Sequence, residues 1–238
     1  MKKIWLTIAA LAIVVIAGIG IALWYELCHI KAQPGWITAD LKDRYYYGSV
    51  GAGKTAGIPY WVWLAMPRLY PEEMHDPGGY AALGMAWEET REMPVGFAKQ
   101  QVGYIRVSGN CALCHVTTQP TQPDQPPRIV PAVSGKTTDL RRLLMFFQES
   151  AADPRFNADE LFSEIDKDTS LSLWDKALYR YVLIPRVKKA FLEDPAKALF
   201  SPAIRAHWQN PQAPFDDPEV KALADYMRRQ SHQAVQQP

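Results

Sequence analysis

The sequence is poor in cysteine and almost without net charge. Its 238 residues include three cysteines, too few for the disulfide framework that holds many small secreted proteins together. Lysine and arginine total 26 against 25 for aspartate and glutamate, which leaves a formal charge of +1. A general nucleic-acid binder carries a clustered basic excess, so we expect no nucleic-acid partner. The same balance excludes an acidic disordered chain.

The sequence also lacks a convincing strand pattern and any internal repeat. Helix signals dominate its second half. Thr138 or Asp139, Asn157, and Asp217-Pro218 each precede apolar residues at helical spacing. With 48% hydrophobic residues, the chain can build a core. The predicted fold is therefore mainly α with long irregular loops.

The apolar residues are concentrated at the N-terminus. Ile4 to Trp24 contains no charged residue, and as a helix it would be about 31 Å long, enough to cross a bilayer core of about 30 Å. Lys2 and Lys3 precede the run and are expected to stay in the cytoplasm. This predicts a single-pass protein of a bacterial inner membrane with the rest of the chain in the periplasm. The alternative is a cleaved signal peptide, although no A-x-A site follows the run. Cys28 invites a lipoprotein interpretation, but a spare thiol fits its bulky and charged neighbours better.

The chain divides into four expected parts. Residues 1–27 form a cytoplasmic tip and transmembrane anchor, 28–57 a connector, 58–230 the folded domain, and 231–238 a flexible tail. Within the domain, Ile58 to Tyr70 is unusually apolar but too short to span a membrane. We expect a core helix or the wall of a pocket there. The alternative is a patch that lies on the membrane surface.

Gly48 to Thr55 matches the phosphate-loop pattern G-x-x-x-x-G-K-[ST]. Such a loop holds phosphate because a buried strand leads into it and a helix follows, so that backbone N–H groups converge on the ligand. Here polar and aromatic residues precede the pattern, and Pro59 stops a helix soon after it. We therefore expect a glycine-rich loop and no nucleotide.

The strongest functional signal is Cys111-Ala112-Leu113-Cys114-His115. In a C-x-x-C-H motif the two thiols attach haem covalently, and the histidine that follows ligates the iron. The motif predicts one haem c, bound through Cys111 and Cys114, with His115 as the proximal iron ligand. The alternatives are a redox-active C-x-x-C pair and half of a zinc site. The sequence shows neither the βαβ context of the first nor a second cysteine pair for the other.

The sixth iron ligand is less well indicated. Met145 is the first candidate, on a predicted helix beside Phe146 and Phe147. The candidates that follow, in order, are Met93, His75, Met227 and His207. An empty position that faces an aromatic pocket is an equal alternative. A second strong ligand makes an electron carrier, whereas an open iron can bind oxygen, peroxide or small gases.

Several stretches resemble a known family. They are GIPYWVWLAMPRLYPEE, PGGYAALGMAWEE, MPVGFAKQQVGYIRVSGNCALCH, AADPRFNADELFSEIDK and LYRYVLIPRVKKAFL. Together they resemble the N-terminal haem region of large periplasmic cytochromes related to di-haem cytochrome c peroxidases and rubber oxygenases. The resemblance covers roughly residues 45–192. It implies covalent haem at Cys111 and Cys114, His115 as proximal ligand, and oxidative or electron-transfer chemistry. Those relatives carry a second C-x-x-C-H, whereas this sequence contains one.

A second resemblance concerns the C-terminal region. FDDPEVKALADYMRRQ is similar to the C-terminal helix of small class I cytochromes, with Tyr226 placed to pack on a helix that leads into the haem motif. In that helix Gly103 would allow a close crossing. The resemblance implies a cytochrome c-like haem domain.

These features predict a membrane-anchored, mono-haem c-type cytochrome that transfers electrons to a redox partner protein or within a membrane respiratory complex. The near-zero charge gives no sign of strong electrostatic steering, which favours a permanent partner. The alternative is a haem-dependent enzyme of peroxidase or oxygenase type, or a haem sensor, with an open iron position. We also expect the aromatic cluster of Tyr60, Trp61, Trp63 and Trp87 to pack near the haem or to brace the loop that carries it; the alternative is a core wall remote from the iron.

Overall fold

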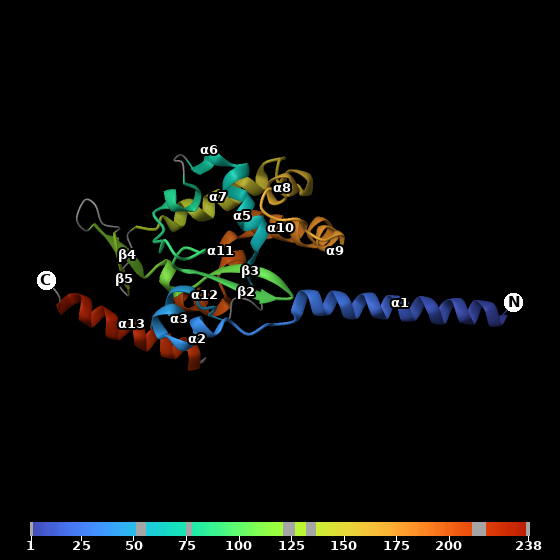
Figure 1. The fold of residues 1–238 in the computed structure, drawn as a ribbon, viewed down its shortest axis with the longest axis horizontal. Helices are drawn as coiled ribbons and strands as arrows, with labels where there is room; N and C mark the ends of the chain where they lie inside the picture. The colour runs from blue at the N-terminus through green and yellow to red at the C-terminus, as the bar shows by residue number, and fades with distance from the viewer. Residues whose placement is uncertain are drawn as a thin grey trace.

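A long N-terminal helix leads into a domain in which helices surround a small sheet (Figure 1). The computed structural model describes residues 2–50, 56–74, 78–120, 127–131, 137–210 and 218–236. Most of the phosphate-loop pattern, residues 51–55, lies outside the described residues, and so does His75. The prediction of a mainly helical chain is confirmed.

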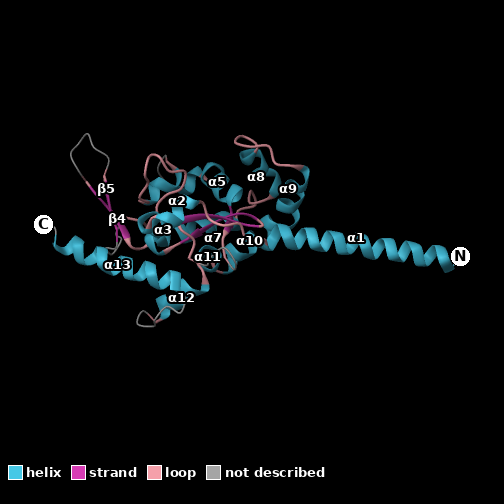
Figure 2. Cartoon of the chain, turned by 60° about the horizontal axis from the view of Figure 1, so that its bottom comes forward, coloured by secondary structure: helices cyan, strands magenta, loops and turns pink. Residues whose placement is uncertain are grey.

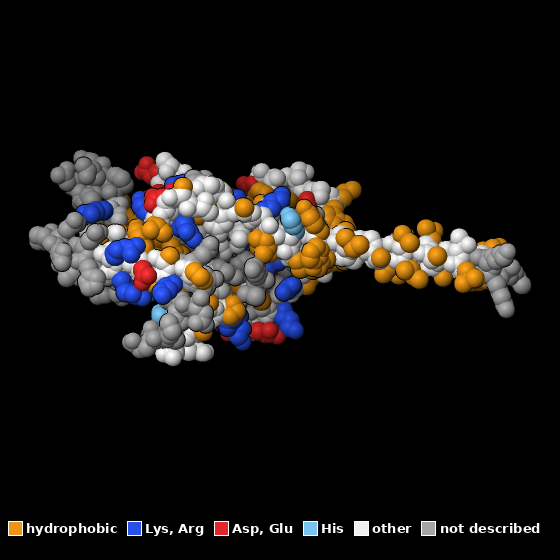
Figure 3. All heavy atoms as spheres, turned by 90° about the horizontal axis from the view of Figure 1, so that it is seen from below, with side chains coloured by type: hydrophobic (Ala, Val, Ile, Leu, Met, Phe, Trp, Pro, Cys, Tyr) orange, Lys and Arg blue, Asp and Glu red, His pale blue; other side chains and the backbone are white. Residues whose placement is uncertain are grey.

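Helix α1 (Lys2–Cys28) is long and apolar enough to cross a membrane. Its apolar span covers 22 residues, Ile4–Tyr25, or about 33 Å of helix. Leu23, near its end, is partly buried against the domain, and the other apolar side chains of the span stand exposed along the helix (Figure 3). A signal sequence meets the same criteria of length and composition. Cys28 is exposed at the end of α1.

The expected connector is part of the folded domain. It forms α2 (Gly35–Ala39) and α3 (Leu41–Tyr47), which is capped by Asp40. Tyr45, Tyr46 and Tyr47 are all buried, although their side chains point in three directions around α3. Burial on every side requires several neighbours, and α3 packs against β2 (Phe97–Val102), α13 (Pro218–Gln236) and the turn that holds the C-x-x-C-H motif.

The structure contains strands where none were expected. Strands β1 (Ile58–Pro59), β2 (Phe97–Val102) and β3 (Tyr104–Gly109) form an antiparallel sheet in the order β1-β3-β2. A separate pair joins β4 (Val116–Gln119) to β5 (Arg128–Pro131).

The β2–β3 hairpin overturns the expected helix before the motif. Val102 pairs with Tyr104, so Gly103 alone makes the turn, with a φ of 70° that suits glycine. Residue 103 is therefore not a helix-crossing position. At the other end of the hairpin Phe97 pairs with Gly109, directly before the motif.

Helix α5 (Tyr60–Leu69) confirms the core helix expected from the apolar run. Val62, Trp63 and Met66 are buried, so this helix is not a patch on the membrane surface. It packs against α8 (Ala158–Ile165) on the face of the domain away from α3 (Figure 1).

The remaining helices are α6 (Pro71–Met74), η1 (Gly79–Leu83), η2 (Cys111–Leu113), α7 (Leu140–Ala152), α9 (Leu173–Leu178), a π-helical turn η3 (Tyr179–Leu183), α10 (Ile184–Glu193), α11 (Pro195–Leu199), α12 (Pro202–Gln209) and α13 (Pro218–Gln236). Asp139 caps α7 and Asn157 caps α8, as predicted. Helix α13 begins at Pro218, also as predicted, but it continues past residue 230, where a flexible tail was expected. It lies beside α3 and β5 (Figure 2).

The tip of the β2–β3 hairpin is attached to the end of α1. The Arg106 guanidinium donates a hydrogen bond to the carbonyl of Leu27 (2.8 Å), and the N–H of Lys31 donates to the carbonyl of Gln101 (2.9 Å). From this junction the hairpin extends into the domain (Figure 1). The six residues of β3 cover about 20 Å, so the C-x-x-C-H motif lies at the end of the hairpin far from α1.

Candidate haem site

The C-x-x-C-H motif forms one tight turn. Cys111–Leu113 make a 3-10 helix, η2. The N–H of Cys114 donates to the carbonyl of Cys111 (3.3 Å), and the N–H of His115 donates to the same carbonyl (3.2 Å). A spacing of three residues on a helical turn places Cys111 and Cys114 on one side.

Asn110 fixes this turn to the rest of the domain. Its side-chain oxygen accepts a hydrogen bond from the N–H of Ala112 (2.9 Å), as an N-cap does. Its side-chain amide donates to the carbonyls of Tyr46 (3.2 Å) and Gly48 (3.1 Å), and its own N–H donates to the carbonyl of Gly96 (2.9 Å). Asn110 is buried. Sequence analysis missed this residue, although an asparagine directly before a helical turn is a known cap signal.

Two glycines let other segments approach the turn closely. Gly96 has a φ of 95°, and a Cβ there would overlap the backbone of Leu113. A Cβ on Gly109 would lie 2.5 Å from the ring of Phe200. The turn is therefore packed from both sides by segments distant in the sequence.

Burial divides the motif into two faces. Ala112 and Leu113 are each 1% exposed and belong to the core. Cys111, Cys114 and His115 are only half-buried. The three side chains that bind haem in a C-x-x-C-H motif thus remain accessible while the turn itself is anchored.

The pKa values of the two thiols do not favour a redox-active pair. Burial, together with the neighbouring Cys114, raises the pKa of Cys111 to about 11, and burial also raises the pKa of Cys114. Redox-active cysteines have the opposite shift, because the thiolate is the reactive form. Both cysteines are free thiols in the structure.

The surroundings of His115 favour a neutral imidazole. Burial lowers its pKa, and His207 adds to the effect because a positive charge there repels a proton on His115. The neutral ring is the form that ligates metal ions. The Tyr45 hydroxyl donates a hydrogen bond to the carbonyl of His115 (2.9 Å), which ties the motif to α3 a second time.

The other residues proposed as ligands lie in different places. Met145 is 41% exposed on α7, whereas its neighbours Phe146 and Phe147 face the core, so its position does not favour iron ligation. Met93 is buried in the core. Met227 is partly buried on α13. His207 lies on α12 and is half-buried.

Tyr226 packs on α3 rather than on a helix that leads directly into the motif. Its ring lies 5.5 Å from that of Tyr45, centroid to centroid. The Tyr45 hydroxyl is hydrogen-bonded to the carbonyl of His115, so the C-terminal helix still contacts a residue that holds the motif in place.

The expected aromatic cluster separates into two parts. Trp63 stacks on Tyr80 with ring centroids 4.4 Å apart and lies 5.8 Å from Phe97, the partner of Gly109 in the sheet. This part of the cluster braces β2, the partner of the strand that leads to the motif. Trp87 is exposed, and its indole N–H donates a hydrogen bond to the carbonyl of Arg91.

The residue types of the motif are those that a covalently bound haem requires. Among the described residues, no group of three or more histidine, cysteine, aspartate or glutamate side chains is arranged to hold an ion. Haem brings its own ring of nitrogen ligands, so the protein supplies only thiols and one or two axial side chains. The half-buried face of the motif offers both thiols and His115.

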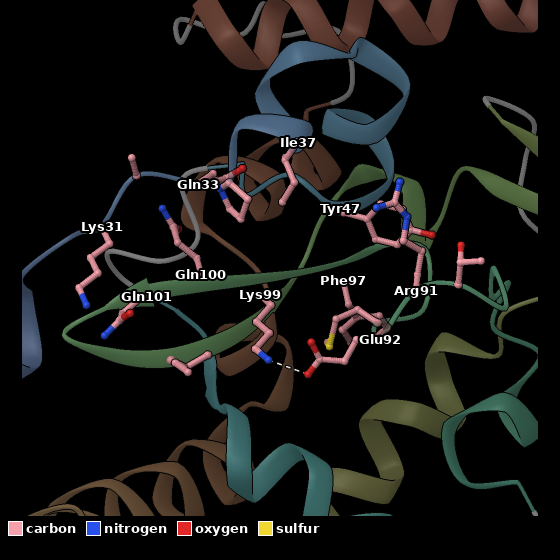
Figure 4. A pocket seen from close by; sticks show the side chains of 15 residues that line it. Lys31, Gln33, Ile37, Tyr47, Arg91, Glu92, Phe97, Lys99, Gln100 and Gln101 are labelled. Carbon is pink, nitrogen blue, oxygen red and sulfur yellow. Dashed lines mark hydrogen bonds and ion pairs between the residues drawn. The ribbon is translucent and has the colours of Figure 1, made fainter.

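A cavity of about 530 Å³ lies between α2 and the β2–β3 hairpin (Figure 4). Lys31, Gln33 and Gln101 line its side near α1, and Tyr47 and Phe97 line its other side. An ion pair between the Lys99 ammonium and the Glu92 carboxylate (2.6 Å) joins two of its lining residues (Figure 4). Its lining residues do not include those of the C-x-x-C-H turn.

Comparison with protein-family models, with curated proteins and with solved structures found no match for this chain.

Proposed function

We propose that this protein is a membrane-anchored, mono-haem c-type cytochrome that transfers electrons on the periplasmic side of a bacterial inner membrane. One observation carries the proposal: Cys111, Cys114 and His115 share the accessible face of a turn whose other face is fixed in the core. When bound, haem would supply an iron centre that alternates between two oxidation states.

Each residue of the turn has a separate task in this proposal. Cys111 and Cys114 would hold the cofactor through their sulfurs, and the elevated pKa of each keeps the free thiol protonated. His115 presents a neutral ring nitrogen to the iron. Asn110 and Tyr45 fix the backbone from which these three side chains project.

A cytochrome c-like arrangement of the domain is also part of the proposal. Such a domain brings its C-terminal helix against a helix near the start of the fold. The contact of Tyr226 on α13 with Tyr45 on α3 supports this arrangement. The hydrogen bond from Tyr45 to His115 connects the helix pair to the motif.

The N-terminal segment supports the proposed anchor and its orientation. Helix α1 would confine the domain to the membrane surface, and Lys2 and Lys3 favour a cytoplasmic N-terminus. Diffusion in two dimensions favours a partner in the same membrane, such as a respiratory complex or another anchored redox protein. The formal charge of +1 offers little electrostatic steering toward a freely diffusing partner.

The proposal is tested by measuring whether the protein carries covalently attached haem. The full chain, produced with a c-type cytochrome maturation system, is expected to give an alkaline pyridine spectrum of c-type haem that resists acid-acetone extraction. Cys111→Ala and Cys114→Ala should each leave at most one thioether bond, and the double variant should hold no covalent haem. The matched control is Cys28→Ala, which removes the exposed thiol outside the motif and should leave haem attachment unchanged. Wild-type protein whose haem is fully extractable, or which contains none, would contradict the proposal.

A further inference from the structure

Arg106 carries a positive charge that is buried without an acidic partner. It lies on β3 and is 7% exposed. Its guanidinium donates a hydrogen bond to the carbonyl of Leu27 (2.8 Å) and lies over the ring of Tyr104, 4.3 Å from the ring centroid. Among the described residues, its buried Nε has no hydrogen-bond partner and no carboxylate pairs with it. Arginine stays protonated in proteins and is rarely buried unpaired, so this position favours an anion that the chain itself does not supply.

A cavity of about 230 Å³ borders Arg106. Strand β3 supplies one wall through Tyr104 and Arg106, α10 supplies another through Arg186 and Val187, and α11 adds Lys197. Arg186 is exposed and forms no ion pair within the described part of the chain. Burial lowers the pKa of Arg106, and the positive charge of Arg186 lowers it further. Two arginines from distant segments therefore line one small cavity.

The carboxylates that line the cavity have partners of their own. Asp194 caps α11, because its carboxylate accepts hydrogen bonds from two backbone N–H groups of that helix, and it also pairs with the Lys197 ammonium (3.5 Å). Glu193 pairs with the Lys189 ammonium (3.7 Å). These contacts offset both negative charges, so the two arginines remain as the uncompensated charges of the lining.

The cavity lies at the end of the domain to which α1 is attached, where α10 is also found (Figures 1 and 2). Leu27, the hydrogen-bond partner of Arg106, comes two residues after the end of the apolar span Ile4–Tyr25, or about 3 Å further along the helix. The polar headgroup layer on each side of a bilayer is roughly 5–7 Å thick. With α1 in a bilayer, the cavity would therefore lie at the level of the headgroup phosphates.

We infer that this cavity binds the phosphate group of an anionic phospholipid through Arg106 and Arg186. An arginine can hold phosphate through two parallel, charge-assisted hydrogen bonds, and the bound anion would compensate the buried charge of Arg106. The cavity is smaller than the roughly 300–1,000 Å³ of pockets for drug-sized molecules, so it suits a headgroup better than a larger ligand. A free phosphate ion has the same chemistry, but the position at the end of α1 favours the lipid. The inference goes beyond the proposed function, because it requires no haem.

Thermal unfolding of the full chain in a non-ionic detergent tests the inference. Phosphatidylglycerol, added to the micelles in steps, is expected to raise Tm to a plateau, because a ligand that binds only the folded state stabilises it. The same amount of phosphatidylcholine, whose headgroup has a phosphate but no net charge, should raise Tm much less. Inorganic phosphate at the same concentration should not raise it.

Four variants locate the site. Arg186→Gln removes an exposed side chain without disturbing the core, and it should weaken the apparent affinity for phosphatidylglycerol about tenfold or more. Arg106→Gln should abolish binding, although it also removes the hydrogen bond to Leu27. Glu193→Gln removes a carboxylate from the lining and should strengthen binding. The matched control is Arg180→Gln, which removes an equal charge from η3, outside the cavity, and should leave the affinity unchanged.

Several results would overturn the inference. An unchanged Tm in phosphatidylglycerol would mean that no such site exists, and equal stabilisation by phosphatidylcholine would mean that the headgroup charge is not recognised. Stabilisation by inorganic phosphate at the same concentration would indicate a site for the free ion. Equal losses of affinity in Arg186→Gln and Arg180→Gln would indicate a general attraction between charges. None of these measurements depends on haem, so their failure leaves the proposed function standing, and protein without covalent haem would leave this inference standing.

Discussion

Replacement of Trp63 by alanine is expected to lower the free energy of unfolding by about 3–5 kcal/mol. Trp63 is 1% exposed, and its ring stacks on Tyr80 at an interplanar angle of 13°. Its removal would leave a large cavity between α5 and β2, beside Phe97. Since single domains are stable by about 5–15 kcal/mol, the loss takes a large share of the total. Chemical denaturation of the solubilised full chain, followed by circular dichroism, measures it.

Two other variants serve as comparisons. Trp87→Ala removes an exposed ring and one hydrogen bond, so we expect a loss of about 1 kcal/mol. Trp63→Phe keeps an aromatic ring in the stack and should cost less than Trp63→Ala. Equal losses for Trp63→Ala and Trp87→Ala would show that the Trp63 stack is not a core element. An altered midpoint potential in Trp61→Phe or Trp63→Phe would show that the rings touch the haem pocket as well as bracing it.

Replacement of Asn110 by alanine is expected to destabilise the domain by about 3 kcal/mol or more. The variant leaves the N–H of Ala112 and the carbonyls of Tyr46 and Gly48 without their partner, at about 1–3 kcal/mol for each group that stays buried and unpaired. The turn would also lose one of its two attachments to α3, and only the hydrogen bond from Tyr45 to His115 would remain, so the yield of covalent haem should fall. Chemical denaturation measures the free energy of unfolding, and the pyridine spectrum of the same preparation measures the yield of covalent haem.

Asn157→Ala is the matched control for Asn110→Ala. Asn157 is also an N-cap, on α8, and its side-chain oxygen accepts from the N–H groups of Asp159 and Glu160 at the surface. Water can replace these bonds, so we expect a loss of about 1 kcal/mol and no change in haem yield. Similar losses in the two variants would mean that Asn110 is an ordinary cap and not an anchor of the motif.

Local signals in the sequence predicted the helices well. Asp139 and Asn157 each have a short polar side chain followed by apolar residues at helical spacing, and each caps the helix that follows it. The apolar run that contains Trp63 could be assigned to the core because it is too short for a membrane and too apolar for a surface. The motif itself was recognised from Cys111 to His115 because its spacing is set by chemistry within one turn.

Local sequence patterns do not reveal structure that depends on contacts between segments far apart in the chain. The segment of β2 does not alternate apolar and polar residues, since Lys99, Gln100 and Gln101 are consecutive and only half-buried. The single-residue turn at Gly103 also lacks the usual two-residue hairpin signal. Tyr45 to Tyr47 looked like a connector, because the elements that bury them come from residues far along the chain.

In the proposed cytochrome, the β2–β3 hairpin would have a consequence for the choice of redox partner. With α1 in a bilayer, the tip of the hairpin rests near the lipid surface at Leu27, and the C-x-x-C-H turn stands about 20 Å higher. The rate of electron transfer falls steeply with distance, so a redox group embedded in the lipid would exchange electrons with this site slowly. A partner whose own redox group projects to the same height would exchange them quickly. If the turn carries haem and α1 spans a membrane, as proposed, the strand pair would select redox partners by their height above the membrane, and a nearly uncharged protein could do so without long-range attraction.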